Sequence, residues 1–405
     1  MANNSRISQS NSVSAKQCGW FRLTVLMCVL LAGSIATRCA SNNSKHLSPE
    51  QTALVGYFSN AQMIRIESVI SEVLQKSGAP GALVGIVGAT DTPIIIAKGY
   101  SNISSSTPME GDLKFRIASN TKTYTAMTVL QLADDPVDPK IDLDKTLEYY
   151  LPGSGIAYAD VITVRQLLNH TSGVASYNEI AAFLDIWLVN PLYEWTKTEI
   201  MDIIRSGSPD FYPGTAGKWK YSDSNYFLLG LIIEKVTGSS AESVITAMTI
   251  DKVGLSSTVF PTTSEAPTPY CTGYKMDSSG NLVEVIKVHP SGPWTGGAMT
   301  SDIRDLAKWV KVLGNGSLLS EMMKAECFTF VPAVDGSTYG LGLMEINGLR
   351  GHTGTIQGHE TAIFYSTQKD LAVVVMLNRC NEENYTGSSI EINIKIFRIL
   401  APELF

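Results

Sequence analysis

The chain carries the stretch Phe-Arg-Ile-Ala-Ser-Asn-Thr-Lys at residues 115–122, directly before a helix-forming run at 123–132. Ser119 would lie at the first turn of that helix, where backbone N–H groups and the helix dipole can stabilise a developing oxyanion. Lys122 follows three residues later and returns to the same helix face. Beside a buried hydroxyl, a desolvated lysine can lose its proton and activate the serine. The stretch therefore predicts a serine nucleophile with a lysine partner.

A second Ser-x-x-Lys pair, Ser366 and Lys369, stands in a polar turn between two strand-like runs. A lysine in such a turn is solvated, and no helix dipole supports the serine. At average composition, chance gives on the order of one or two such pairs in a chain of this length. We interpret the second pair as a chance match. The first pair has a plain alternative too, a serine that caps a helix beside a surface lysine, so its assignment depends on further motifs.

Five further motifs follow the first pair in order. They are Leu-Leu-Asn-His-Thr-Ser-Gly at 167–173, Tyr-Ser-Asp-Ser-Asn-Tyr at 221–226, Gly-Ala-Met-Thr-Ser at 297–301, Tyr-Gly-Leu-Gly-Leu at 339–343 and Gly-His-Thr-Gly-Thr at 351–355. With residues 115–122, this ordered set resembles the class C β-lactamase and penicillin-binding-protein-like serine hydrolases. That family includes D-alanyl-D-alanine carboxypeptidases, D-aminopeptidases and esterases. The resemblance covers about residues 60–400.

The resemblance implies catalytic roles at the matching positions. Ser119 would attack the substrate carbonyl and become acylated. Lys122 and Tyr221 would move the proton, with Tyr221 as general base during attack and as general acid toward the leaving group. An isolated tyrosine is a poor base at neutral pH, so this role requires an adjacent lysine ammonium. His352 completes the predicted catalytic set, whereas His170 and Ser172 are interpreted as structural.

The resemblance also implies which residues contact substrate. The backbone N–H groups of Ser119 and Thr355 would form the oxyanion hole. Gly354 would let its strand approach the substrate backbone closely. The predicted substrate-binding residues are Asp223, Thr353, Gly354 and Thr355.

Two positions depart from the family pattern. Asp223 stands where the family commonly has asparagine, so an acceptor-only carboxylate replaces a side chain that also donates. After Tyr-Gly-Leu-Gly-Leu, carboxypeptidase-like members can place an arginine that holds a peptide carboxylate. Here residues 344–346 are Met-Glu-Ile, and Arg350 is offset. These changes favour a neutral ester or amide, or a substrate with a cationic amine, over a free C-terminal carboxylate.

The predicted function is therefore a serine hydrolase that acts through an acyl-enzyme on an ester, amide or D-amino-acid peptide bond, in the manner of D-alanyl-D-alanine carboxypeptidases. A β-lactamase-like carboxylesterase is the nearest alternative. A catalytically silent binding member of the family is a third, although the serine, lysine and tyrosine are all present. The expected partner is a small-molecule or peptide substrate. No zinc-type Cys or Cys/His spacing occurs in the sequence, so no metal or cofactor is expected.

Composition and apolar patterning predict the fold. The chain has 44% hydrophobic and 17% charged residues and a net charge of −7, which fits a globular protein and disfavours nucleic-acid binding. Apolar runs predict strands at both chain ends (82–87, 94–97, 361–365, 371–377), and helical spacing predicts helices at 64–74 and 390–400. Four more helices are predicted between them (121–132, 164–168, 226–236, 303–313). The predicted class is α/β (α+β), β-lactamase/transpeptidase-like, with an antiparallel sheet from both chain ends flanked by helices and a helix-rich lobe.

The first residues resemble a targeting segment. A basic stretch without acids leads into an apolar run at 23–36, so residues 1–36 predict a signal peptide or, if uncleaved, a membrane anchor. Residues 37–58 are predicted as a flexible linker and residues 59–403 as the hydrolase domain. The expected location is secreted or extracytoplasmic, with a membrane tether through 23–36 as the alternative. Cys327 and Cys380 form the first candidate disulfide, because both belong to the later catalytic half.

Overall fold

The structure, a computed structural model, describes residues 58–405 except 90–91, 278, 335 and 381–386. The described residues belong to the compact unit Ser48–Phe405, and the other unit, Met1–Leu47, lies outside them. The predicted leader at 1–36 and the predicted linker, except its last residue, therefore also lie outside the described residues. Among the residues described, no helix combines the length and apolar character needed to span a membrane.

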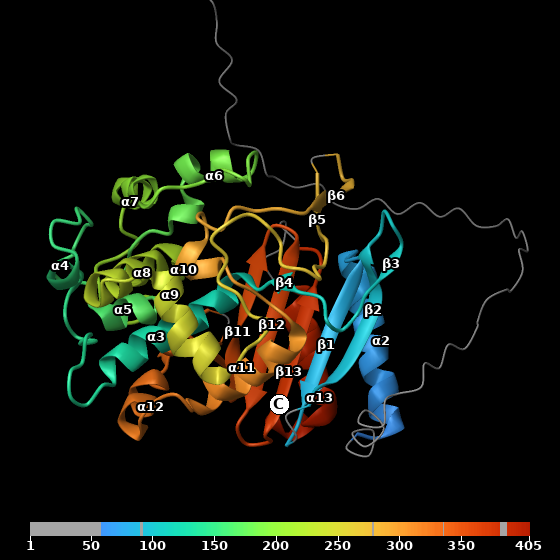
Figure 1. The fold of residues 1–405 in the computed structure, drawn as a ribbon. Coiled ribbons are helices and arrows are strands. Elements are labelled where there is room, and N and C mark those ends of the chain that lie inside the picture. The colour runs from blue at the N-terminus through green and yellow to red at the C-terminus, as the bar shows by residue number, and fades with distance from the viewer. Residues whose placement is uncertain (1–57, 90–91, 278, 335, 381–386) are drawn as a thin grey trace, which may run out of the picture. The chain divides into compact units, whose positions relative to one another are not determined.

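A nine-stranded antiparallel sheet joins the two ends of the domain (Figure 1). Its order is β3-β2-β1-β13-β12-β11-β10-β9-β8. At its centre β1 (Gly81–Val87) pairs with β13 (Leu371–Leu377), with Ala82 opposite Leu377. Both strands are buried along their whole length, as continuous apolar runs covered on two faces should be. The predicted sheet built from both chain ends is confirmed.

The other strands complete this sheet and two small pairs. In the sheet these are β2 (Ile94–Asn102), β3 (Thr107–Pro108), β8 (Val331–Pro332), β9 (Thr338–Tyr339), β10 (Met344–Ile346), β11 (Leu349–Ile356) and β12 (His359–Ser366). The pairs outside it are β4 (Phe115–Arg116) with β7 (Thr300–Ser301), and β5 (Gly273–Met276) with β6 (Leu282–Val285).

Helices cover both faces of the sheet (Figure 1). The helices α2 (Asn60–Ser77) and α13 (Ser388–Leu400) pack on one face, and α11 (Ile303–Asn315) packs on the other. Successive strand residues point to opposite faces. In β13, Val373 belongs to the core beneath α2 and α13, while Val374 belongs to the core beneath α11. The predicted terminal helices are thus confirmed as one cover of the sheet.

The middle of the chain forms the helix-rich lobe. All four helices predicted there are confirmed, and three of them lie in the lobe, whereas the fourth, at 303–313, is α11 on the sheet. The helix α3 runs through the lobe with every residue from Thr121 to Leu132 buried. The helices of the lobe are α3 (Thr121–Ala133), α4 (Leu147–Tyr150), α5 (Val164–Leu168), α6 (Ala181–Trp187), α7 (Lys197–Ser206), α8 (Asp223–Thr237), α9 (Ala241–Ile245), α10 (Trp294–Gly297) and α12 (Glu321–Cys327).

The predicted disulfide between Cys327 and Cys380 is wrong. Cys327 is a buried free cysteine at the end of α12, where its thiol contacts the Leu341 carbonyl. Cys380 follows β13, and its sulfur accepts a hydrogen bond from the Gly358 N–H. A disulfide needs Cα atoms about 4.4–6.8 Å apart, and membership of the same half of the chain does not provide that. Burial raises the pKa of the Cys327 thiol to about 12, so this cysteine is unreactive.

Candidate active site

Ser119 stands where a short 3-10 turn, Ala118–Asn120, runs into α3. The residue before it, Ala118, has a φ of +49°, a region that residues with a Cβ rarely adopt. Backbone strain of this kind is often found at functional sites. Ser119 itself is half-buried and lines a pocket. The local fold thus presents its hydroxyl at the start of a buried helix, as the sequence predicted.

Lys122 is completely buried and makes three hydrogen bonds through its ammonium group. Its Nζ donates to Ser119 Oγ at 3.0 Å, to the Gly296 carbonyl at 2.8 Å and to Asp223 Oδ1. Burial lowers the pKa of Lys122, and the Asp223 carboxylate opposes that shift. Three acceptors match the three N–H donors of a charged lysine. The geometry therefore describes an ammonium ion that holds the serine hydroxyl.

Asp223 begins α8 and forms an ion pair with Lys122. Its Oδ2 accepts a hydrogen bond from Asn178 Nδ2, and its backbone N–H donates to Ser176 Oγ at 2.8 Å. The carboxylate side chain is 16% exposed, so part of it faces the pocket. Neither Asn178 nor the Gly296 carbonyl was predicted from the sequence. Asn178 lies outside every motif, and any residue type can supply a backbone carbonyl.

Tyr221 places its ring beside the lysine, with Lys122 Nζ 4.8 Å from the ring centroid. Its hydroxyl is buried and makes no well-formed hydrogen bond within the described residues. Ser119 is nevertheless close to Tyr221, and the Ser119 hydroxyl would stabilise a Tyr221 phenolate. Burial, reinforced by the Asp223 charge, raises the pKa of Tyr221 well above its ordinary value. Tyr221 is therefore a neutral phenol beside Ser119.

The motif at 167–173 supports the Tyr221 segment. His170 Nδ1 accepts a hydrogen bond from the Ser222 N–H at 3.1 Å, and the His170 ring centroid lies 4.3 Å from that of Tyr221. Ser172 Oγ donates to Asn225 Oδ1 at 2.7 Å. Both His170 and Ser172 are buried. These contacts give the two residues a structural role, in line with their interpretation from the sequence.

His352 lies behind Tyr221, with the two ring centroids 6.1 Å apart. Its Nε2 is hydrogen-bonded to Tyr339 Oη at 2.9 Å, and its Nδ1 to the Thr353 carbonyl. Burial, followed by the nearby Lys122 charge, lowers the pKa of His352 to about 3. The imidazole is thus neutral and already engaged. Its catalytic role stays a prediction, and its position is that of a support for Tyr221.

The strand β11 forms the wall opposite α3. The neighbouring strand β10 pairs with β11 only over Leu349–Gly351 in the described sheet, so the edge from His352 onward is open toward the serine. Thr355 is exposed on that edge and lines the same pocket as Ser119. The oxyanion role of its N–H and the substrate contacts of Thr353 and Gly354 stay predictions.

Close packing explains why residue 354 is a glycine, and the sequence alone did not reveal this. A Cβ at this position would lie 2.3 Å from the Ile117 carbonyl oxygen and 2.8 Å from Thr361 Oγ1. The close approach that glycine permits here is thus between β11 and the segment before Ser119. This contact sets the distance between the two walls of the site.

Replacing Gly354 with alanine should therefore push β11 away from the Ser119 segment. We expect a loss of about 1–3 kcal/mol in the free energy of unfolding, as for other forced overpacking, and at least about a tenfold fall in acylation rate because the site is misplaced. Urea unfolding and labelling kinetics measure both. Gly111→Ala is the control, since its methyl would meet only the Ile95 side chain, at 3.1 Å. Equal effects of the two variants would contradict the account.

Ser119, Asp223 and Thr355 share one pocket with an empty volume of about 460 Å³. An aromatic wall faces them, in which the rings of Phe183 and Trp187 stack with centroids 5.5 Å apart. The pocket therefore has a charged end beside Ser119 and an apolar end.

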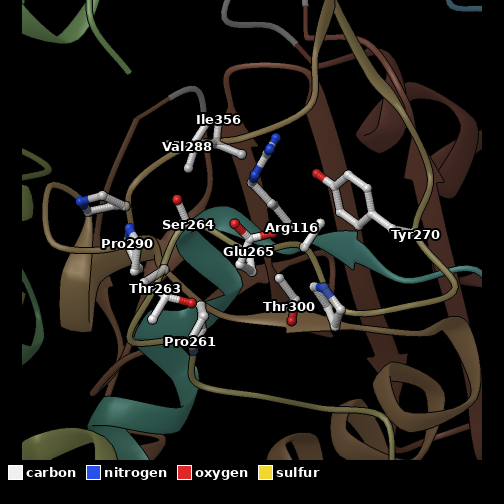
Figure 2. Close-up of a pocket in the computed structure, with 14 residues that line it drawn as sticks. Arg116, Pro261, Thr263, Ser264, Glu265, Tyr270, Val288, Pro290, Thr300 and Ile356 are labelled. Carbon is white, nitrogen blue, oxygen red and sulfur yellow. The ribbon is translucent and has the colours of Figure 1, made fainter. Parts of the chain in front are cut away.

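A second pocket adjoins the first and shares Pro293 and Ile356 with it. Figure 2 shows Arg116 and Tyr270 together on one side of this pocket. The buried Arg116 guanidinium donates to the carbonyls of Ile286 at 2.6 Å and Gln357 at 3.2 Å, and lies 5.4 Å from the Tyr270 ring centroid. This arginine ties two loops to the strand β4, three residues before Ser119. We assign it a structural role.

The family model Beta-lactamase matches residues 66–388. Protein flp of Staphylococcus aureus (strain COL) is 26% identical over 334 residues, covering 80% of this chain and 64% of its own length. A D-aminopeptidase of Gluconobacter oxydans is 22% identical over 334 residues, covering 80% of this chain and 61% of its own length. The chain thus spans less than two thirds of the length of these relatives.

A solved structure has the same fold as this chain. The D-stereospecific amidohydrolase from Streptomyces sp. superposes with a TM-score of 0.72 at 29% identity, and the match covers 83% of this chain and 98% of the other. The predicted fold class, a β-lactamase/transpeptidase-like sheet with a helical lobe, is confirmed.

Proposed function

The chain belongs to the Beta-lactamase family, and on that premise we propose that it is a serine hydrolase that cleaves amide bonds of D-amino-acid amides or short D-peptides. The observation that carries the proposal is the buried hydrogen bond from Lys122 Nζ to Ser119 Oγ, beside Asp223 in one pocket. A serine activated by a buried amine-bearing partner is the arrangement that covalent acyl transfer requires.

The chemistry is the formation and hydrolysis of an acyl-enzyme. Ser119 Oγ attacks the substrate carbonyl, and the N–H groups of Ser119 and Thr355 receive the oxyanion at the open edge of β11. The raised pKa of Tyr221 keeps its hydroxyl protonated, which suits a donor to the leaving amine nitrogen. Water then attacks the acyl-enzyme and releases the acid.

Two kinds of support favour an amide of a D-amino acid. The D-aminopeptidase and the D-stereospecific amidohydrolase are relatives whose names state that class of substrate. The 16% exposed Asp223 carboxylate provides an acceptor for a substrate ammonium close to Ser119, since each oxygen retains a lone pair beside its present partner. The aromatic pair Phe183 and Trp187 offers an apolar surface for the side chain of that amino acid.

Recognition of a peptide carboxylate has less support. Arg350, the arginine nearest to the position where carboxypeptidase-like members bind that group, donates to the Gly314 carbonyl at 3.0 Å and lies 3.8 Å from the Phe328 ring centroid. It is thus held by groups outside the pocket.

A substrate panel tests the proposal. We expect D-phenylalaninamide to be hydrolysed with a kcat/KM at least about tenfold above those of its L-enantiomer and its N-acetyl derivative, the size of effect expected from one charge-assisted hydrogen bond. Preference for an N-acylated D-alanyl-D-alanine peptide would instead support a carboxypeptidase. Turnover of p-nitrophenyl acetate without any amide hydrolysis would support a carboxylesterase. Either result would overturn the amidase proposal.

A further inference from the structure

We propose that Asp223 is the final acceptor of the Ser119 proton, which it receives through Lys122 when the serine attacks. This inference rests on the proposed function and adds a catalytic residue to it. Its basis is a continuous chain of three polar groups in which Ser119 Oγ lies 3.0 Å from Lys122 Nζ, and that same Nζ is paired with Asp223 Oδ1. The nitrogen has no exposed surface, because the Lys122 side chain is completely buried.

The surroundings hold this chain of groups in place. The Gly296 carbonyl accepts the third hydrogen of Lys122 at 2.8 Å, so the amine cannot turn away from the other two partners. Asn178 Nδ2 and the Ser176 hydroxyl fix Asp223, through its Oδ2 and its backbone N–H respectively. These contacts therefore form a continuous path for a proton from the serine to the carboxylate.

Tyr221 is poorly suited to accept this proton. A phenolate there would be desolvated and would stand close to the Asp223 charge, and both effects raise the pKa of Tyr221. With asparagine in place of Asp223 the second effect would vanish. The Asp223 carboxylate thus disfavours the phenolate form of Tyr221, which is the form that could act as a base. The carboxylate is itself able to accept a proton.

The proton balance of the acylation step is complete. During attack, Lys122 passes one proton to the Asp223 carboxylate and takes the Ser119 proton, while the Oγ–C bond forms and the carbonyl electrons move to the oxyanion. When the C–N bond breaks, the Tyr221 hydroxyl gives its proton to the leaving nitrogen. A proton returns to Tyr221 through Lys122, which regains one from Asp223. The ion pair is restored and no other reactant is consumed.

The other ionisable groups around the pair are neutral across the useful pH range. Three tyrosines, Tyr177, Tyr221 and Tyr339, have pKa values raised well above 10. Burial is the main cause, and the Asp223 charge adds to it. Lys122 acts on His170 and His352, and burial lowers the pKa of the first well below 6.5 and of the second to about 3. Near neutral pH, these five side chains are therefore uncharged.

The decisive variant is Asp223→Asn, tested by the pre-steady-state burst with p-nitrophenyl acetate. This substrate has no ammonium, so any role of Asp223 in binding a cationic substrate does not enter. We expect the acylation rate to fall at least about 100-fold, the usual contribution of a general base. If Tyr221 is the base, removing the neighbouring charge should leave the rate equal or raise it. That outcome would overturn the inference.

The control is Asp202→Asn, which makes the same charge change at an exposed ion pair with Arg205 on α7. It should acylate at the rate of the unmodified protein. If the unmodified protein gives no burst, or a Ser119→Ala protein gives an equal one, the proposed function itself fails. A normal burst in the unmodified protein with an undiminished one in Asp223→Asn overturns only the role of Asp223.

A second measurement covers the case in which Asp223→Asn does not fold, since it leaves a buried ammonium without its partner. In the unmodified protein, acylation corrected for hydroxide hydrolysis should not rise from about pH 7 to 10, because the proton passes to the carboxylate and not to an ionised phenol. A rate that keeps rising to pH 10 would show that deprotonation of Tyr221 or of Lys122 supplies the base, and either result would overturn the inference.

Discussion

Replacing Ser119 with alanine is expected to abolish covalent labelling by a fluorophosphonate and to lower amide turnover by at least about 10³-fold, because loss of a nucleophile removes the covalent path and leaves only binding and oxyanion contributions. The fold should be unaffected, since the side chain is half-buried and loses one hydrogen bond, from Lys122. Intact-mass spectrometry measures the adduct, and turnover is followed on D-phenylalaninamide.

The chain offers a matched control in its second Ser-x-x-Lys pair. Ser366 is buried at the end of β12, and Lys369 forms an ion pair with Glu403. Neither residue lines the pocket around Ser119. Ser366→Ala should keep the full adduct and turnover. An adduct of equal yield on the Ser119→Ala protein would refute the assignment of the nucleophile.

The sequence predicted the sheet well, because burial on both faces leaves a continuous apolar run that needs no neighbour to be recognised. The strands at 82–87 and 371–377 carry that signal, and they pair at the centre of the sheet. The same holds for the Ser119–Lys122 pair, whose helical spacing places both residues on one face. Local pattern was sufficient to predict the strands and the contact between Ser119 and Lys122, whereas the assignment of this pair as catalytic depended on the other motifs.

Features that depend on contacts distant in the sequence were not predictable. Asn178 and the Gly296 carbonyl complete the polar cluster from segments with no recognisable motif. The predicted link from Cys327 to Cys380 failed for the same reason, since pairing depends on a separation in space. The tight packing of Gly354 on the Ile117 carbonyl likewise becomes visible only when two distant segments meet.

The protein is expected to lose much of its stability between pH 6.5 and 5, before most carboxylates titrate. Three histidines, His170, His352 and His359, are buried. Burial lowers the pKa of His352 to about 3, and the other two well below 6.5. Because the unfolded chain titrates near 6.5, it binds more protons than the folded chain below that pH, and the free energy of unfolding must fall. Each histidine contributes about 1.4 kcal/mol per pH unit.

Urea unfolding at pH 7.5, 6.5, 5.5 and 5.0 measures this dependence. Three histidines together give a slope of about 2 kcal/mol per pH unit at pH 6.5, where the unfolded imidazoles are half protonated, which approaches about 4 kcal/mol per pH unit near pH 5.5 and below. This is large against a typical total stability of about 5–15 kcal/mol. His359→Asn is the informative variant. His359 lies outside the catalytic pocket and is hydrogen-bonded through Nε2 to the Cys271 carbonyl at 3.1 Å, a contact that an amide N–H can replace. The variant should lower the slope by about one third, since it removes one of three equal titrations. A free energy of unfolding that is constant from pH 7.5 to 5.0 would mean that these imidazoles accept protons in the folded state. The account of His170 and His352 as buried, neutral side chains would then be wrong.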